Sequence, residues 1–187
     1  MKRFLVVLVI VLVFPVIALA AAPMTRADVL FNGIGRFTPQ ATVTKTWGIA
    51  HYQEKMIDNT TSKLYGGIRV YYNRFLEVRA LDISARDVLT ARGIGVGDDK
   101  DDVFRMYGEP VQTQMNVNTL ELLITYRLTN EKPDPAGITF LTFVMKNRKI
   151  KNIIVDGTID ERINPFVRIH GVMQPKTGYR DYDTQNE

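Results

Sequence analysis

A short glycine motif occurs twice in this chain, and its spacing constrains the fold more than any other feature. Gly33-Ile34-Gly35 is followed 60 positions later by Gly93-Ile94-Gly95. Residues suited to the same structural roles follow both motifs at the same distances: Thr38, Val43, Trp47 and Gly48 in one case, Asp98, Val103, Tyr107 and Gly108 in the other. A repeated spacing of this length is typical of a chain that contains two copies of one structural unit.

Each copy is predicted to begin with a short helix. In the second copy Asp98 suits the N-cap, and the acidic residues that follow it lie at the positive end of the helix dipole. In the first copy Thr38 takes the cap and Pro39 the first helical position, where a missing N–H costs nothing. Gly48 and Gly108 can adopt the left-handed conformation that ends a helix.

Runs rich in β-branched and aromatic residues follow each predicted helix, which indicates strands. The first copy has three such runs, 49–56, 63–72 and 75–83; the second has four, 111–115, 120–128, 138–146 and 149–155. The sequence therefore predicts an α+β fold of two tandem repeats, residues 23–83 and 84–157, each a short helical segment followed by a three- or four-stranded antiparallel sheet. Residues 158–187 are rich in Pro, Gly and polar side chains and are predicted to form a weakly ordered tail.

The N-terminus predicts export. Lys2 and Arg3 precede an uncharged, largely apolar run that ends in alanines, so residues 1–22 have the pattern of a signal peptide. A retained membrane anchor is the alternative, since about 20 apolar residues span a bilayer. Pro15 and the alanine cluster favour cleavage, which would leave no stable membrane span and place the protein in the periplasm or outside the cell.

The composition excludes several kinds of catalytic site and of binding partner. The absence of cysteine excludes disulfides, zinc thiolates and a thiol nucleophile. The 24 basic and 20 acidic residues are interleaved along the chain, so they create no extended field of a single sign. The charge pattern therefore predicts no nucleic-acid partner. No nucleotide-binding spacing is present and no cofactor is expected. His51 and His170 are the only histidines, and neither lies in a catalytic motif.

One acidic cluster could bind a metal: Asp98, Asp99, Asp101 and Asp102. Clustered carboxylates suit calcium. However, the segment lacks the alternating oxygen ligands and the central glycine of a dedicated calcium loop. The start of a helix already accounts for these acids, so we favour the helix-capping interpretation.

The residues from Thr90 to Asp98, together with Val103 and the run Tyr107-Gly108-Glu109-Pro110, resemble the repeat of exported bacterial helix-plus-sheet domains. Those domains include small lipoproteins of outer-membrane assembly and a tandem-repeat β-lactamase inhibitor protein. The resemblance implies a concave sheet that grips a protein partner. This chain departs from both relatives because it has neither a lipid-anchoring cysteine nor disulfides.

Aromatic side chains are the best sequence candidates for binding: Tyr65, Tyr71, Tyr72, Phe75 and Tyr126. Rigid rings supply a large contact area at low entropic cost. Tyr71 and Tyr72 must point to opposite faces of a strand, so one of the two is expected to be exposed. The sequence thus predicts a non-catalytic, inhibitor-like binding protein for a protein or cell-envelope component. The alternatives are a cell-envelope hydrolase with an Asp or Glu pair and an assembly factor that docks by strand addition.

Overall fold

The computed structural model describes residues 21–56, 60–128 and 138–158. Almost all of the predicted signal peptide (1–22) and of the predicted tail (158–187), including His170, lies outside these ranges. Neither helix within them is long enough and apolar enough to cross a membrane.

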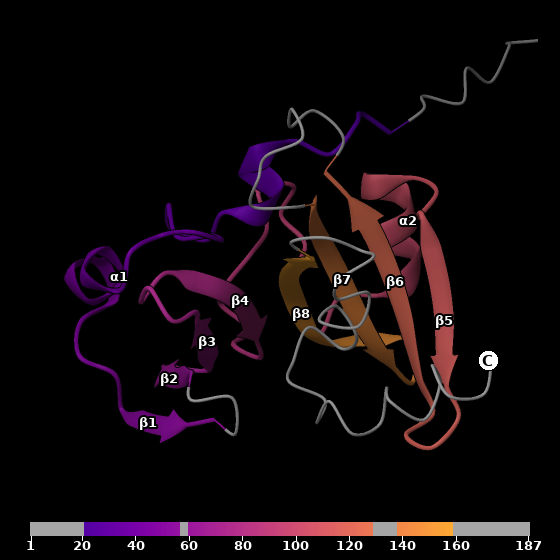
Figure 1. Cartoon of the computed structure of the whole chain (residues 1–187). Helices are drawn as coiled ribbons and strands as arrows, with labels where there is room; N and C mark the ends of the chain where they lie inside the picture. The colour runs from indigo at the N-terminus through magenta and orange to yellow at the C-terminus, as the bar shows by residue number, and fades with distance from the viewer. Residues whose placement is uncertain (1–20, 57–59, 129–137, 159–187) are drawn as a thin grey trace, which may run out of the picture.

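All strands within the described ranges belong to a single antiparallel sheet (Figure 1). In sequence order they are β1 Tyr52–Lys55, β2 Thr61–Tyr65, β3 Ile68–Tyr72, β4 Val78–Ile83, β5 Gln112–Asn116, β6 Glu121–Arg127, β7 Ile138–Lys146 and β8 Lys149–Thr158. In space the order is β1-β2-β3-β4-β8-β7-β6-β5. The strands that end the sheet are therefore β1 and β5.

The predicted fold of two tandem helix-plus-sheet repeats is wrong, because the described part of the chain forms one eight-stranded sheet and only two α-helices. Strand β4 pairs with β8 at the centre, with Leu81 opposite Val155 and Ile83 opposite Ile153. This pairing gives partners to two backbone edges that separate sheets would leave open. Residue patterns show where strands occur, but they do not show which strand edges meet.

The run 63–72, predicted as one strand, is two. Gly66 and Gly67 interrupt it, and both have positive φ values, 51° and 88°. Such values at two consecutive residues suit a tight hairpin, so the chain reverses between β2 and β3. Asn147 and Arg148 form the corresponding turn between β7 and β8, with φ values of 51° and 65°.

The two helices are α1 Gln40–Trp47 and α2 Lys100–Tyr107, with Gly48 and Gly108 as their C-caps, as predicted. Their starts are shifted by one residue. The N-caps are Pro39 and Asp99. Thr38 and Asp98 instead close the preceding turns: the Thr38 hydroxyl accepts the Gly35 N–H at 3.1 Å and the Asp98 carboxylate accepts the Gly95 N–H at 2.8 Å.

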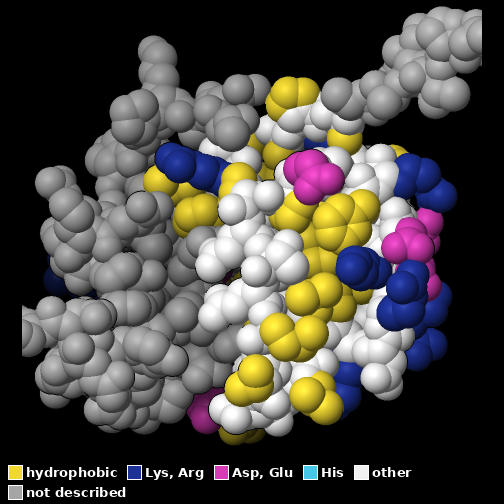
Figure 2. All heavy atoms as spheres, turned by 90° about the vertical axis from the view of Figure 1, so that its right-hand side faces the viewer, with side chains coloured by type: hydrophobic (Ala, Val, Ile, Leu, Met, Phe, Trp, Pro, Cys, Tyr) yellow, Lys and Arg dark blue, Asp and Glu magenta, His cyan; other side chains and the backbone are white. Residues whose placement is uncertain are grey.

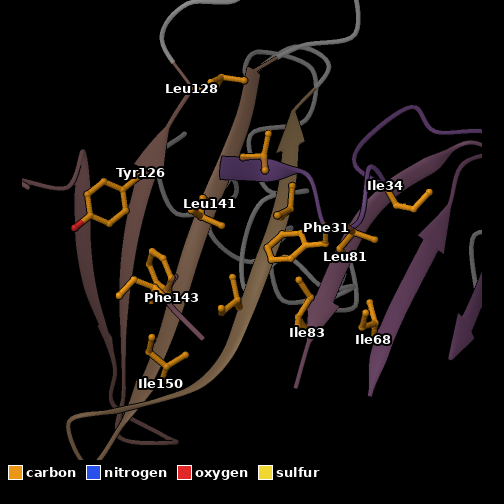
Figure 3. Packing of buried hydrophobic residues seen from close by; sticks show 14 of the residues in the cluster. Phe31, Ile34, Ile68, Leu81, Ile83, Tyr126, Leu128, Leu141, Phe143 and Ile150 are labelled. Carbon is orange, nitrogen blue, oxygen red and sulfur yellow. The ribbon is translucent and has the colours of Figure 1, made fainter. Parts of the chain in front are cut away.

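One face of the sheet carries the main core (Figure 3), and both helices contribute to it. Val43 of α1 and Val103 and Tyr107 of α2 belong to the same buried cluster as the side chains of the central strands. The cluster also includes Phe31, Leu81, Ile83, Ile124, Leu141, Phe143, Ile153 and Val155. Alternate residues of these strands point to the opposite face, which is therefore the face left free by α1 and α2.

A buried ion pair ties the segment before the first glycine motif to the segment before the second. Asp28 lies in a short 3-10 helix, Arg26–Val29, and is 2.9 Å from Arg92 Nε and 3.1 Å from Arg92 Nη2. Arg92 also donates to the carbonyl oxygens of Ala22, Pro23 and Met106, each at 2.8 Å, and stacks 4.5 Å from the Tyr107 ring centre. The guanidinium thus joins the stretch 22–28 to the end of α2.

Replacing Arg92 with alanine should reduce the free energy of unfolding by about 3–5 kcal/mol, because it leaves the Asp28 carboxylate buried without its cation. Urea unfolding measures the change. Arg105→Ala is the matched control: its pair with Asp102 is exposed, so the expected cost is below about 1 kcal/mol. Equal losses in the two variants would contradict the assigned role of Arg92.

The same ion pair predicts a pH dependence. Burial raises the pKa of Asp28, but hydrogen bonds from Arg92 and Thr25 outweigh burial and hold this pKa below its ordinary value. The resulting stabilisation is present above the unfolded-state pKa, about 3.9, and is lost as the pH falls through the lower folded-state pKa. The urea midpoint of the wild type should therefore fall more steeply than that of Asp28→Asn between about pH 5 and pH 2. Parallel curves would contradict this assignment.

Candidate binding surface

The acidic cluster serves the start of α2. Asp99 is the N-cap and accepts the Asp101 N–H at 3.3 Å, while the Asp102 carboxylate accepts the Asp99 N–H at 3.4 Å. The hydrogen bond from Asp101 contributes most to lowering the pKa of Asp99. Arg148 lies 2.8 Å from Asp101. Among the described residues, no three acidic or histidine side chains converge to hold a metal ion.

Asp98→Ala should reduce the free energy of unfolding by about 1 kcal/mol, because the Gly95 N–H loses its acceptor. Asp87→Ala is the control, since Asp87 is an exposed turn residue and the expected change is below about 0.5 kcal/mol. Chemical denaturation with and without calcium provides the measurement. A calcium-dependent stabilisation that Asp98→Ala abolishes would instead establish a metal site.

Four of the five aromatic candidates are buried, namely Tyr65, Tyr71, Tyr72 and Tyr126. The Tyr65 and Tyr72 hydroxyls are 3.2 Å apart within the core, and Tyr126 donates to the Gly108 carbonyl at 2.9 Å. Phe75 is 67% exposed, in the turn before β4. The five rings therefore do not form one exposed surface.

The expectation that Tyr71 or Tyr72 would be exposed is wrong. The two rings do point to opposite faces: Tyr72 lies in the core, while Tyr71 pairs with Ser62 and Ala80 outside it. Tyr71 is nevertheless buried, and burial is the main cause that raises its pKa. Both faces of the sheet are therefore covered at Tyr71 and Tyr72. The alternation of side chains along a strand does not show whether a face is covered.

The sheet face opposite the helices combines a small apolar cluster with paired polar groups. Leu123, Val144 and Ile154 form the cluster. Polar pairs on strands of the same sheet include Arg69 with Glu54 at 3.2 Å, Asn152 with Asp82 at 2.7 Å and Lys151 with Glu121 at 2.7 Å. Burial raises the pKa of Asp82 despite the hydrogen bond from Asn152. Each of these carboxylates is thus held by a neighbouring side chain.

Exposed apolar side chains gather instead at β5. Val111, Met115, Val117 and Leu120, which we call the β5 edge surface, are between 53% and 75% exposed. Viewed from the side of β5 and α2, hydrophobic side chains form a band beside backbone and uncharged side chains, with charged residues at its border (Figure 2). Other exposed large hydrophobic residues lie in short separate segments, such as Ile49 and Leu89. Contiguous exposed apolar side chains commonly mark interaction sites.

Strand β5 itself is an open edge without charge. Among the strands that the structure describes it pairs only with β6, and its sequence, Gln112 to Asn116, contains no charged residue and no proline. The opposite edge strand β1 carries Glu54 and Lys55, and Glu54 is paired with Arg69. Charges on edge strands discourage pairing with other chains. The two edges of this sheet therefore differ in their capacity to accept another strand.

Sequence reasoning missed this surface, although the sequence carries a signal for the strand itself. From Val111 to Val117 small, apolar or threonine side chains alternate with the amides Gln112, Gln114 and Asn116. In the strand, Thr113 and Met115 lie opposite Ile124 and Leu122, on the face that carries the helices. The pattern indicates a strand, but its exposure follows only from its place at the end of the sheet.

No model of a known protein family matches the chain, and no curated protein matches it in sequence. Two solved structures align with parts of it. An extracellular protein containing an SCP domain from Bacillus anthracis is 6% identical, with a TM-score of 0.48, over 75% of this chain and 48% of that one. A DUF4309 family protein from Bacillus subtilis is 10% identical, with a TM-score of 0.42, over 65% and 79%. The chain spans about half the length of the first, and neither likeness assigns it a family or a function.

Proposed function

We propose that this protein is an exported, non-catalytic binding protein that recognises a protein or cell-envelope component through one edge of its sheet. The β5 edge surface is the observation that supports the proposal. It combines an open strand without charges with four exposed apolar side chains. The predicted signal peptide supports a location in the periplasm or outside the cell.

Recognition at an edge differs from the binding by a concave sheet that the family resemblance implies. A partner strand added beside β5 forms main-chain hydrogen bonds, which supply affinity, while alternate side chains contact the neighbouring apolar surface and supply specificity. Met115 near the end of β5 and Val117 directly after it are suited to the second task because both are exposed. This binding is still inhibitor-like, because the protein would bind its partner without catalysing a reaction.

The alternative, a cell-envelope hydrolase, has one observation in its favour. Burial raises the pKa of Asp82, which is what a general acid requires. Hydrolysis also needs a second carboxylate free to act as base or nucleophile. Glu54, on the same side of the sheet, is paired with Arg69, so we favour binding.

Met115→Lys tests the proposal. A lysine in the β5 edge surface places an unpaired charge where a partner would bury an apolar side chain, so the amount of partner captured from envelope extracts should fall at least tenfold. Immobilised protein and quantitative mass spectrometry provide the measurement. The control is Gln53→Lys, an exposed position on the opposite edge strand β1, which should leave capture unchanged. Recovery of no specific partner by the wild type, or equal recovery by both variants, would overturn the proposal.

A further inference from the structure

The residues around β5 have a pattern that matches itself when reversed. Antiparallel pairing of two copies centred on Gln114 places Gln112 opposite Asn116 and Thr113 opposite Met115. The flanking residues Val111 and Val117 also meet. Each amide therefore faces an amide, and each apolar or threonine side chain faces one of the same group.

We infer that β5 pairs antiparallel with β5 of a second copy of this chain, so that two sheets join into one continuous sheet across a two-fold axis at Gln114. The inference rests on the proposed function, because it names a partner for the same edge. Both copies present the same patch in such a contact, as symmetric dimers require.

Charge favours this pairing over the alternatives within the described residues. A two-fold antiparallel pair places the residue on the axis opposite its own copy, so a charge at that position would repel the same charge of the second copy. The segment from Val111 to Val117 has no charge. Self-pairing of β1 would instead bring the charged residues Glu54 and Lys55 of both copies into the contact.

The apolar side chains beside the strand add buried area. Thr113 and Met115 lie on the helix-bearing face of the sheet, and the two-fold axis keeps that face on the same side in both copies. Phe104 of α2 and Leu122 of β6, both partly buried against the core, belong to the same side of the molecule. Pairing of β5 with β5 of a second copy would bury apolar side chains of the β5 edge surface that a single copy leaves exposed.

Introduced cysteines provide a direct test, because the chain has none of its own. In the full-length exported protein, Gln114→Cys places two thiols directly opposite each other, at a Cα separation of roughly 4.5–5.5 Å that a disulfide can bridge. Mild oxidation should convert most of this variant into a covalent dimer. Gln53→Cys, on the open edge of β1, should remain monomeric.

Sedimentation of the wild type across a concentration series should show a monomer–dimer equilibrium, and Gln114→Lys should weaken the dimer at least tenfold while retaining the wild-type circular dichroism spectrum. A wild type that stays monomeric, equal cross-linking of both cysteine variants, or a dimer that Gln114→Lys leaves intact would overturn the inference. A monomer that still loses its envelope partner on Met115→Lys would preserve the proposed function with a different occupant. A wild type that forms the dimer but captures nothing from the envelope would preserve the β5 pairing and overturn the proposed recognition of an envelope component.

Discussion

The structure depends on where the backbone edges of its sheet find partners. Four-stranded sheets in each half would leave four edges with unpaired N–H and C=O groups. Pairing of β4 with β8 removes two of them and places apolar residues such as Leu81 and Val155 opposite each other. The two edges that remain, β1 and β5, are the only strand edges left open by the described order. They differ in charge, and this difference leads to the proposed function.

Contacts away from the strands hold the two halves of the chain in this arrangement. The Arg92 guanidinium joins the segment at Asp28 to the end of α2, through hydrogen bonds to carbonyl oxygens and a stacked Tyr107 ring. A cation that serves so many groups is costly to remove, because every acceptor would lose its donor.

The sequence predicted local features well, because the signals for them are local. Gly48 and Gly108 end helices where expected, and the strand positions follow the apolar runs. The exact helix starts were displaced by one residue, since Thr38 and Asp98 satisfy the turn before the helix rather than its first N–H groups. A Thr or Asp side chain can accept a hydrogen bond either from the turn before a helix or from the first turn of the helix. The sequence does not show which of the two N–H groups it accepts from.

The sheet topology and the candidate site could not be predicted in the same way, because both depend on contacts between distant segments. Tyr71 and Tyr72 alternate as expected, yet both are buried. Met115 was assigned to a strand without any indication that the strand would end the sheet. Exposure is a property of the assembled sheet, so the sequence could not show that four of the five aromatic candidates would be buried.

Hydrogen–deuterium exchange of β5 tests the central claim most directly. The claim predicts that, in dilute protein, outward-facing amides between Val111 and Val117 exchange far faster than those of the central strands β4 and β8. Protection of these amides should then appear as the protein is concentrated or its partner is added. Amides of β5 that are as protected in dilute protein as those of β8, or that remain unprotected under every condition, would contradict the account.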